Sequence, residues 1–317
     1  MLDASPAQTH AVVVGGGTMG ADVAAVLLRG GCRVTVIEPS AERRTALLNH
    51  LDTQLAALGI GHRAGRAACV PTLEATDWSD VALTVECVPE QLSLKQQVFA
   101  RLVALARADA ALTSNSSSFP ISAIAQGLAS QERMLGLHFF MPAHLVPLVE
   151  VVLGPSSDAT LADRLCAFMR GCGNVPVLVR KDKPGFLANR LQHALAREAF
   201  ALIDEGVATP EDVDAAVRFG FGFRFLAAGP VLQRDHAGLD VHCAAAATMY
   251  PSLACDKQPA RVLREQVAAG HLGMKAGKGF YTWTPERRQA ERERYDNLLR
   301  QGLALLAAEL PPLDFTQ

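Results

Sequence analysis

A short apolar strand, a glycine turn and a helical stretch near the start of the chain constrain its fold more than any other feature. Residues 11–14 read AVVV, residues 15–20 read GGGTMG, and a helical stretch then leads into a second apolar run, CRVTVIE. This order of strand, glycine turn, helix and strand is a βαβ unit. Because parallel strands need crossover helices, we expect a mostly parallel sheet with helices on both of its faces.

The glycines of the turn have the spacing G-x-G-x-x-G, which binds a dinucleotide where it joins a strand to a helix. Gly15 suits the tight turn, Gly17 lets the backbone approach a pyrophosphate at the helix N-terminus, and Gly20 permits close packing of the helix on the strand. Glu38 ends the second strand, where an acid binds the ribose diol and repels a 2′-phosphate. We therefore expect NAD rather than NADP. Two neighbouring arginines weaken this preference, and a flavin is the alternative cofactor.

The alternation of apolar strands and helical segments continues as far as Lys181 and then stops. Strands are expected at residues 82–88, 111–114, 134–140, 148–152 and 175–179. The segments that follow Lys181 have the apolar spacing of long helices. The predicted fold class is therefore α/β, with an N-terminal Rossmann-type dinucleotide-binding domain over residues 1–181 and an all-helical C-terminal domain over residues 182–317.

Composition narrows the classes of function. The 317 residues are 50% hydrophobic and 20% charged, with a formal net charge of -2, which excludes a disordered chain and a dedicated nucleic-acid binder and favours a small-molecule substrate. The cysteines form no CxxC pair, which indicates reduced thiols. Without a signal peptide or an apolar run long enough to span a membrane, the chain is expected to be cytoplasmic. Its histidines and cysteines lack metal-ligand spacing, so no metal site is expected.

A second group of candidate residues lies in the stretch GLHFFMPAHLVPLVEVV. His138 ends one expected strand and Glu150 lies on the returning strand, so a hairpin would bring the imidazole and the carboxylate together. Such a pair fixes the tautomer of the imidazole and stabilises its protonated form, which suits a general base that accepts the proton of an alcohol. Residue types alone leave the pair open, because a histidine and a glutamate at this separation are usually unrelated.

Three further motifs, SNSSS (114–118), KPGFLANRL (183–191) and LGMKAGKGFY (272–281), complete a pattern that resembles the NAD-dependent L-3-hydroxyacyl-CoA dehydrogenase family. The resemblance implies an active site between the Rossmann-type domain and a helical domain that makes a homodimer. It also implies that His138 is the general base paired with Glu150, and that Ser117 and Asn189 hydrogen-bond the reacting oxygen of the substrate. The cofactor contacts that it implies, together with those of the glycine turn, are Gly15, Gly16, Gly17, Thr18, Met19, Gly20, Glu38, Glu90, Lys95, Ser117 and Lys275.

Three departures from the family pattern bear on the substrate. Met141 stands in HFFMP where the family has an asparagine, and a thioether lacks the amide's donors and acceptor. The segment after Glu38 is shorter than in acyl-CoA enzymes, and Gln54 and Gly61 occupy the positions that contact CoA there. Arg224, in RFGFGFRFLAAGP, suits a substrate carboxylate, with a solvated or helix-capping arginine as the alternative.

The expected activity is the NAD-dependent interconversion of an L-3-hydroxyacyl-CoA or 3-hydroxy acid with its 3-oxo form. One alternative is a dehydrogenase of a free, polar hydroxy acid, like relatives that act on carnitine, gulonate or a pyridine carboxylate. An alternative of another class is a catalytically silent NAD-binding protein with a structural role.

Overall fold

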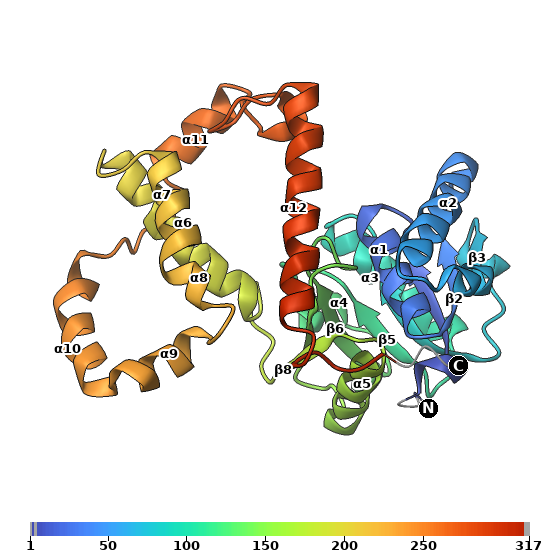
Figure 1. Ribbon diagram of the computed structural model, residues 1–317. Helices are drawn as coiled ribbons and strands as arrows, with labels where there is room; N and C mark the ends of the chain where they lie inside the picture. The colour runs from blue at the N-terminus through green and yellow to red at the C-terminus, as the bar shows by residue number, and fades with distance from the viewer. Residues whose placement is uncertain (1, 3–4, 314–317) are drawn as a thin grey trace. The chain divides into compact units, whose positions relative to one another are not determined.

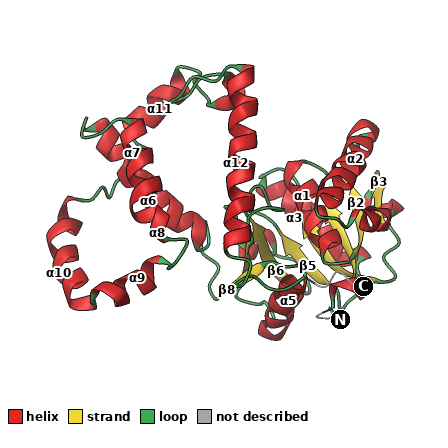
Figure 2. Ribbon diagram, in the orientation of Figure 1, coloured by secondary structure: helices red, strands yellow, loops and turns green. Residues whose placement is uncertain are grey.

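The computed structural model describes residue 2 and residues 5–313 of the chain. They fall into two compact units, a first unit of the described residues up to 189 together with 307–313, and a second unit of residues 190–306 (Figure 1). The first unit contains the sheet, and the second is helical (Figure 2). No helix among the described residues combines the length and the apolar character needed to cross a membrane.

The first unit is built on one eight-stranded sheet with the order β3-β2-β1-β4-β5-β6-β7-β8. Only β6 and β7 pair antiparallel among its strands, so the sheet is mostly parallel as predicted. The strands are β1 (His10–Val14), β2 (Arg33–Ile37), β3 (Ala67–Val70), β4 (Val81–Glu86), β5 (Ala111–Ser114), β6 (Met134–Phe139), β7 (Leu148–Leu153) and β8 (Val175–Val179). Strand β3 was not predicted, because four residues at a half-exposed sheet edge carry little periodic signal.

Helices cover both faces of the sheet, because buried apolar side chains alternate along its strands. In β1, Ala11 and Val13 point into one core and Val12 and Val14 into the other. The first core is closed by α1 (Thr18–Arg29), α2 (Ala41–Ala57) and α5 (Ala159–Gly171), and the second by α3 (Leu92–Leu105) and α4 (Ile121–Ile124).

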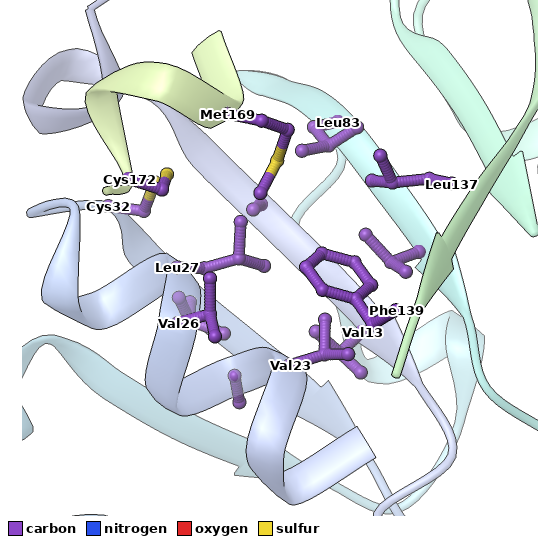
Figure 3. Packing of buried hydrophobic residues seen from close by; sticks show 14 of the residues in the cluster. Val13, Val23, Val26, Leu27, Cys32, Leu83, Leu137, Phe139, Met169 and Cys172 are labelled. Carbon is purple, nitrogen blue, oxygen red and sulfur yellow. The ribbon is translucent and has the colours of Figure 1, made fainter. Parts of the chain in front are cut away.

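Packing in the first core holds the glycine turn and the strand of His138 in one rigid body. Figure 3 shows Leu27 of α1, Val13 of β1 and Phe139 of β6 in one cluster of buried side chains. Leu27 and Val13 are 0% exposed and Phe139 is 2% exposed. Full burial of one such side chain stabilises a fold by about 1.5–3 kcal/mol, so the two segments that carry the candidate site are fixed to each other.

The second unit consists of helices joined by turns. Its helices are α6 (Ala188–Asp204), which starts in the first unit, α7 (Pro210–Ala216), α8 (Gly222–Arg224), α9 (Pro230–Ala237), α10 (Leu239–Met249), α11 (Arg261–Ala268) and α12 (Pro285–Leu305). Helix α7 begins at a capping box formed by Thr209 and Asp212. Of the described residues 190–306, only Ala228 is buried, at 8% exposure. Within this unit, α9 and α10 extend away from α6 (Figure 1).

Candidate active site

The glycine turn after β1 has a geometry that side chains would disrupt. Gly15 has a left-handed backbone with φ of 107°, and a Cβ there would lie 2.8 Å from the carbonyl oxygen of Cys87. A Cβ on Gly20 would lie 1.8 Å from the carbonyl oxygen of Gly15. Both positions therefore require glycine, which confirms the roles in the turn and in helix packing expected from the sequence.

Gly17 differs from its neighbours because it faces open space. It is the N-cap of α1, and a Cβ there would meet no atom within 4 Å. Thr18 and Met19 follow as the first residues of the helix, whose free N–H groups and dipole attract anions. The turn thus fits the pyrophosphate of a dinucleotide, because the absence of a side chain on Gly17 lets a phosphate reach the backbone N–H donors.

Glu38 lies directly after β2 and is 5% exposed. Its Oε2 accepts the N–H of Gly16 at 3.3 Å, and its Oε1 accepts the N–H of Ser40 at 3.0 Å. Arg44 donates to the main-chain carbonyls of Glu38 and Pro39. The carboxylate is therefore held beside the glycine turn, where a ribose next to the pyrophosphate would lie.

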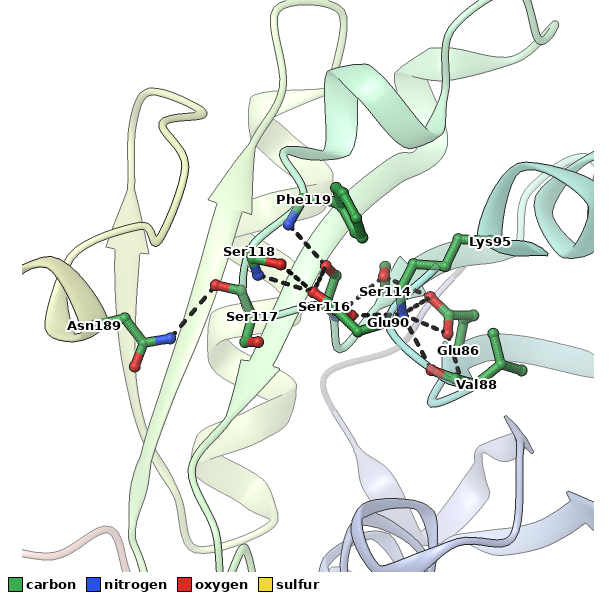
Figure 4. Close-up of polar contacts among 10 residues, drawn as sticks. All are labelled: Glu86, Val88, Glu90, Lys95, Ser114, Ser116, Ser117, Ser118, Phe119 and Asn189. Atoms are coloured by element: carbon green, nitrogen blue, oxygen red, sulfur yellow. Dashed lines mark hydrogen bonds and ion pairs between the residues drawn. The ribbon is translucent and has the colours of Figure 1, made fainter. Parts of the chain in front are cut away.

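An ion-pair network around the buried Lys95 and Glu86 lies at the ends of β4 and β5 (Figure 4). Lys95, from α3, is 1% exposed, and its Nζ lies 2.9 Å from Glu86 Oε1 and 3.2 Å from Glu90 Oε2. Glu86 is fully buried and also accepts the hydroxyl of Ser114 at 2.6 Å. The ammonium of Lys95 is thus bound to carboxylates, and its predicted cofactor contact stays a prediction.

Glu90 joins the loop after β4 to the SNSSS loop after β5. Its Oε1 accepts the hydroxyls of Ser116 at 2.7 Å and Ser118 at 2.6 Å. Burial raises the pKa of Glu90, but the two serines and Lys95 outweigh it and bring this pKa to about 2. Glu90 is therefore ionised at neutral pH and fixes the loop that carries Ser117.

His138 and Glu150 lie directly opposite each other in β6 and β7. His138 Nδ1 is 2.7 Å from Glu150 Oε2, and the residues are 4% and 0% exposed, so the pairing predicted from the hairpin is confirmed. Burial raises the pKa of Glu150, yet the contact with His138 and two backbone N–H groups lower it overall. The ionised carboxylate orients the ring, whose Nε2 makes no hydrogen bond to the described residues.

The second oxygen of Glu150 holds the start of α6. Oε1 accepts the N–H groups of Leu187 at 3.0 Å and Ala188 at 2.8 Å. Asn189 follows, and its Nδ2 donates to the main-chain oxygen of Ser117 at 3.4 Å (Figure 4). Contacts within the first unit therefore link His138 to Glu150, Glu150 to the residues before Asn189, and Asn189 to Ser117.

Aromatic rings enclose the imidazole. The ring centroids of Phe140 and Phe186 lie 4.5 Å and 5.5 Å from that of His138. Phe186 has a left-handed backbone with φ of 51°, which is uncommon for a bulky residue, and such strained residues cluster at functional sites. Met141, directly after Phe140, is 62% exposed.

The other predicted residues lie elsewhere. Gln54 is half-buried on α2, and Gly61 begins the turn after it. Arg224 ends α8 and Lys275 lies in the 3₁₀ turn Met274–Ala276; both are exposed and both belong to the helical unit. Their roles stay predictions.

Sequence reasoning missed two residues that shape the site. Glu86 anchors Lys95 and Ser114, and Asn115 accepts the N–H of Phe139 at 2.8 Å, which ties the end of β5 to the end of β6. An acid inside the apolar run ALTVECV was the available signal for Glu86, since a buried carboxylate needs a partner.

Two family models cover most of the chain. The model described as 3-hydroxyacyl-CoA dehydrogenase, NAD binding domain, matches residues 10–183, and the model of the C-terminal domain of the same enzymes matches residues 185–283. The chain belongs to the 3-hydroxyacyl-CoA dehydrogenase family. As a member it is an NAD-dependent oxidoreductase of the CH–OH group with a small-molecule substrate, which confirms the family, the fold class and the cofactor predicted from the sequence.

Curated relatives of this dehydrogenase include enzymes with and without CoA in their names. The chain is 37% identical to 5-formyl-3-hydroxy-2-methylpyridine 4-carboxylate 5-dehydrogenase of Mesorhizobium japonicum, over 89% of this chain and 94% of the relative. It is 35% identical to 3-hydroxybutyryl-CoA dehydrogenase of Mycobacterium tuberculosis, over 86% of this chain and 97% of the relative. A crystal structure of a 5-formyl-3-hydroxy-2-methylpyridine 4-carboxylic acid 5-dehydrogenase, described as an NAD+ dependent dismutase, superposes with a TM-score of 0.85 at 31% identity, covering 93% of this chain and 98% of that one.

Proposed function

We propose that this dehydrogenase oxidises a free hydroxy acid rather than a CoA ester, with His138 as its general base. The observation that carries the role of His138 is its pairing with Glu150, at 2.7 Å in a site where both side chains are buried. A buried carboxylate on Nδ1 leaves Nε2 to accept a proton and stabilises the imidazolium that forms.

Each residue of the cluster then has a role in the reaction. NAD, held at the glycine turn and Glu38, supplies the hydride acceptor. His138 Nε2 removes the hydroxyl proton, and Glu150 keeps the Nδ1–H tautomer and balances the charge of the imidazolium. Ser117 and Asn189 donate to the substrate oxygen and stabilise charge that develops there. Glu90 and Lys95 keep the loop of Ser117 in place.

The basic side chains of the segment after α2 support the choice of a free acid. Arg63 is 2% exposed and donates to the main-chain oxygen of Arg29, and Arg66 donates to that of Ala7. Both guanidinium groups thus donate hydrogen bonds to main-chain oxygens of the protein itself. Gln54 and Gly61, at the positions that resemble the CoA contacts, carry no charge for a phosphate.

Similarity to a non-CoA relative points the same way. The TM-score of 0.85 with the pyridine-carboxylate dehydrogenase exceeds the 0.72 found for a 3-hydroxybutyryl-CoA dehydrogenase of Escherichia coli. We therefore include aromatic carboxylates among the candidate substrates. On this proposal, Arg224 pairs with the substrate carboxylate, and Lys275 contacts the cofactor.

A panel of substrates tests the proposal. NADH oxidation is measured with acetoacetyl-CoA, with acetoacetate and other free 3-oxo acids, and NAD+ reduction with hydroxymethyl- and formylpyridine carboxylates. We expect turnover with free acids and at least tenfold lower kcat/KM with the CoA ester. Preference for acetoacetyl-CoA would overturn the choice of a free acid and leave the role of His138 standing, whereas undiminished turnover of His138→Gln would overturn the role of His138.

We also propose that two copies form a homodimer through the helical unit. Amphipathic helices normally bury an apolar face, yet only Ala228 is buried among the described residues of this unit. Val231, Leu239 and Tyr250 of α9, α10 and the turn that follows are 77%, 62% and 69% exposed. Helices α6 and α7 also line an apolar groove of about 310 Å³ with Phe280. A second copy would cover these surfaces.

Sedimentation velocity tests this assembly. We expect a dimer for the parent protein and a monomer for Val231→Asp, because a buried unpaired carboxylate disrupts an apolar interface. The matched control is Glu211→Gln at an exposed position of α7, which should stay dimeric. A monomeric parent protein at micromolar concentration would contradict the proposal.

A further inference from the structure

Asp22 is a buried carboxylate close to the cofactor end of α1. It is 2% exposed and lies five residues after the N-cap Gly17, which corresponds to about 7.5 Å along the helix axis. The neighbouring residues of the helix are apolar, and the family's catalytic pattern gives Asp22 no task. A carboxylate at this depth needs partners, because burial penalises its charge.

Three segments meet at this carboxylate. Oδ2 accepts the N–H of Ala143 at 3.1 Å. Oδ1 lies 3.1 Å from Nδ1 of His144 and 3.5 Å from Nε2 of His50. Ala143 and His144 belong to the loop that follows β6 and its His138, and His50 belongs to α2. These two histidines are the ionisable side chains that face Asp22 from α2 and from the loop, and on α1 itself Arg29 donates to the main-chain oxygen of His144.

Asp22 carries its charge at neutral pH. Burial raises the pKa of Asp22, but His144, His50 and the Ala143 amide outweigh burial and bring this pKa to about 2. A fixed negative charge therefore lies under the helix end that is proposed to bind a pyrophosphate. Such a charge reduces the positive potential of the helix N-terminus and repels phosphate.

The two imidazoles lie within ion-pair distance of the Asp22 carboxylate. His50 Nε2 and both ring nitrogens of His144 are buried, and none has an aligned hydrogen bond among the described residues. A neutral ring in this position contributes little, whereas a protonated ring attracts the carboxylate strongly. Histidine is the side chain that ordinarily changes charge between pH 5 and 8.

We propose that Asp22, His144 and His50 form a proton-dependent electrostatic control of cofactor affinity. Protonated imidazoles cancel the charge of Asp22, so the N-terminus of α1 binds the pyrophosphate more tightly; neutral imidazoles leave the charge uncompensated, and binding weakens. The same contacts tie the loop after His138 to α1, which makes Asp22 a positioning residue as well. This inference rests on the proposed pyrophosphate site at the glycine turn.

NADH titrations followed by protein and NADH fluorescence test the control without using turnover. They are made at pH 6 and pH 8 in a His138→Gln background, so that protonation of His138 does not contribute. We expect an NADH Kd about threefold lower at pH 6 than at pH 8. Adding Asp22→Asn, which keeps the oxygen that accepts the Ala143 N–H, removes the carboxylate charge and should lower the Kd at pH 8 at least to the parent value at pH 6.

Histidine variants should change the NADH Kd in the opposite direction to Asp22→Asn. Adding His144→Asn and His50→Gln together should give a Kd that is independent of pH and about as high as the parent value at pH 8. His62→Gln, at an exposed position, is the matched control and should keep the threefold difference. His50→Gln alone, at a half-exposed position that tolerates substitution, should reduce the difference.

The possible outcomes distinguish the proposed electrostatic effect of Asp22 and the histidines from structural damage and from failure of the proposed function. A parent Kd that is equal at both pH values would overturn the proposed electrostatic effect. Weaker binding in both the Asp22 and the histidine variants would overturn it too. Failure of NADH to bind the parent at either pH would instead contradict the cofactor site. The activity assays with His138→Gln decide the role of the base independently of these titrations.

Discussion

Glu150 contacts His138 Nδ1 at 2.7 Å with one carboxylate oxygen and holds the first N–H groups of α6 with the other. Asn189 comes directly after those N–H groups in the chain. One fully buried side chain therefore sets the spacing between the proposed base and the amide proposed to bind the substrate oxygen. Rigid placement of reacting groups contributes strongly to catalysis, so Glu150 acts on both halves of the proposed chemistry.

Replacing His138 with glutamine is expected to lower kcat by about 10²–10⁴, the usual contribution of a general base. NADH affinity at pH 8 should change less than twofold, since the glycine turn and Glu38 are untouched. Steady-state kinetics and fluorescence titration measure the two effects. His62→Gln is the control, and an unchanged kcat in His138→Gln would refute the assignment.

Replacing Glu150 with glutamine should lower kcat about 10–100-fold, because a neutral amide stabilises the imidazolium less than a carboxylate does. Unfolding should also become easier by about 1–3 kcal/mol, since buried groups lose charge-assisted hydrogen bonds. Denaturant unfolding and kinetics check both values. Glu132→Gln, at an exposed site, should match the parent protein, and a Glu150→Gln enzyme with full activity would contradict this role.

Gly17→Ala and Gly20→Ala should differ in which property they lower, NADH affinity or thermal stability. A Cβ at Gly17 meets no protein atom within 4 Å, so this variant should keep its Tm and lose about tenfold or more in NADH affinity. A Cβ at Gly20 lies 1.8 Å from the oxygen of Gly15, so that variant should lose stability as well. Equal effects of both variants on Tm would show that Gly17 serves packing.

Low pH should remove the contribution of Asp22 to the free energy of unfolding. The pKa of Asp22 is about 2 in the folded chain against an ordinary value of 3.8, so its contribution is complete above pH 3.8 and is lost as pH falls to about 2. The contribution is on the order of 2 kcal/mol. Unfolding free energies between pH 5 and pH 2 measure it, and Asp22→Asn should fall less steeply. Parallel curves for the two proteins would contradict the assignment.

Local patterns in the sequence predict most of the sheet and the pairing of His138 with Glu150. Strand alternation and the hairpin between Phe139 and Leu148 act over short separations, so the residues themselves carry the signal. The edge strand β3 was missed because it has only four residues. The domain boundary after Lys181 and the roles of Arg224 and Lys275 stay predictions.

The sequence does not predict which distant segments contact each other. Asp22 and Ala143 are 121 residues apart, and Glu86 and Ser114 are 28 apart. A polar residue in an apolar segment, such as Glu86 in ALTVECV, signals that it needs a partner, but the sequence does not show which one. Its function depends on which strand ends become neighbours in the sheet, and that order is set by the packing of the whole unit.

The nearly coreless helical unit has a consequence for how this dehydrogenase tolerates mutation. If a second copy supplies its interior, every substitution at the shared surface occurs twice in each assembly, and its energetic effect is doubled. Thermal stability will then rise with protein concentration, because dilution separates the copies. The sheet unit, with its own core, has neither property, so the two halves of one chain evolve under different constraints.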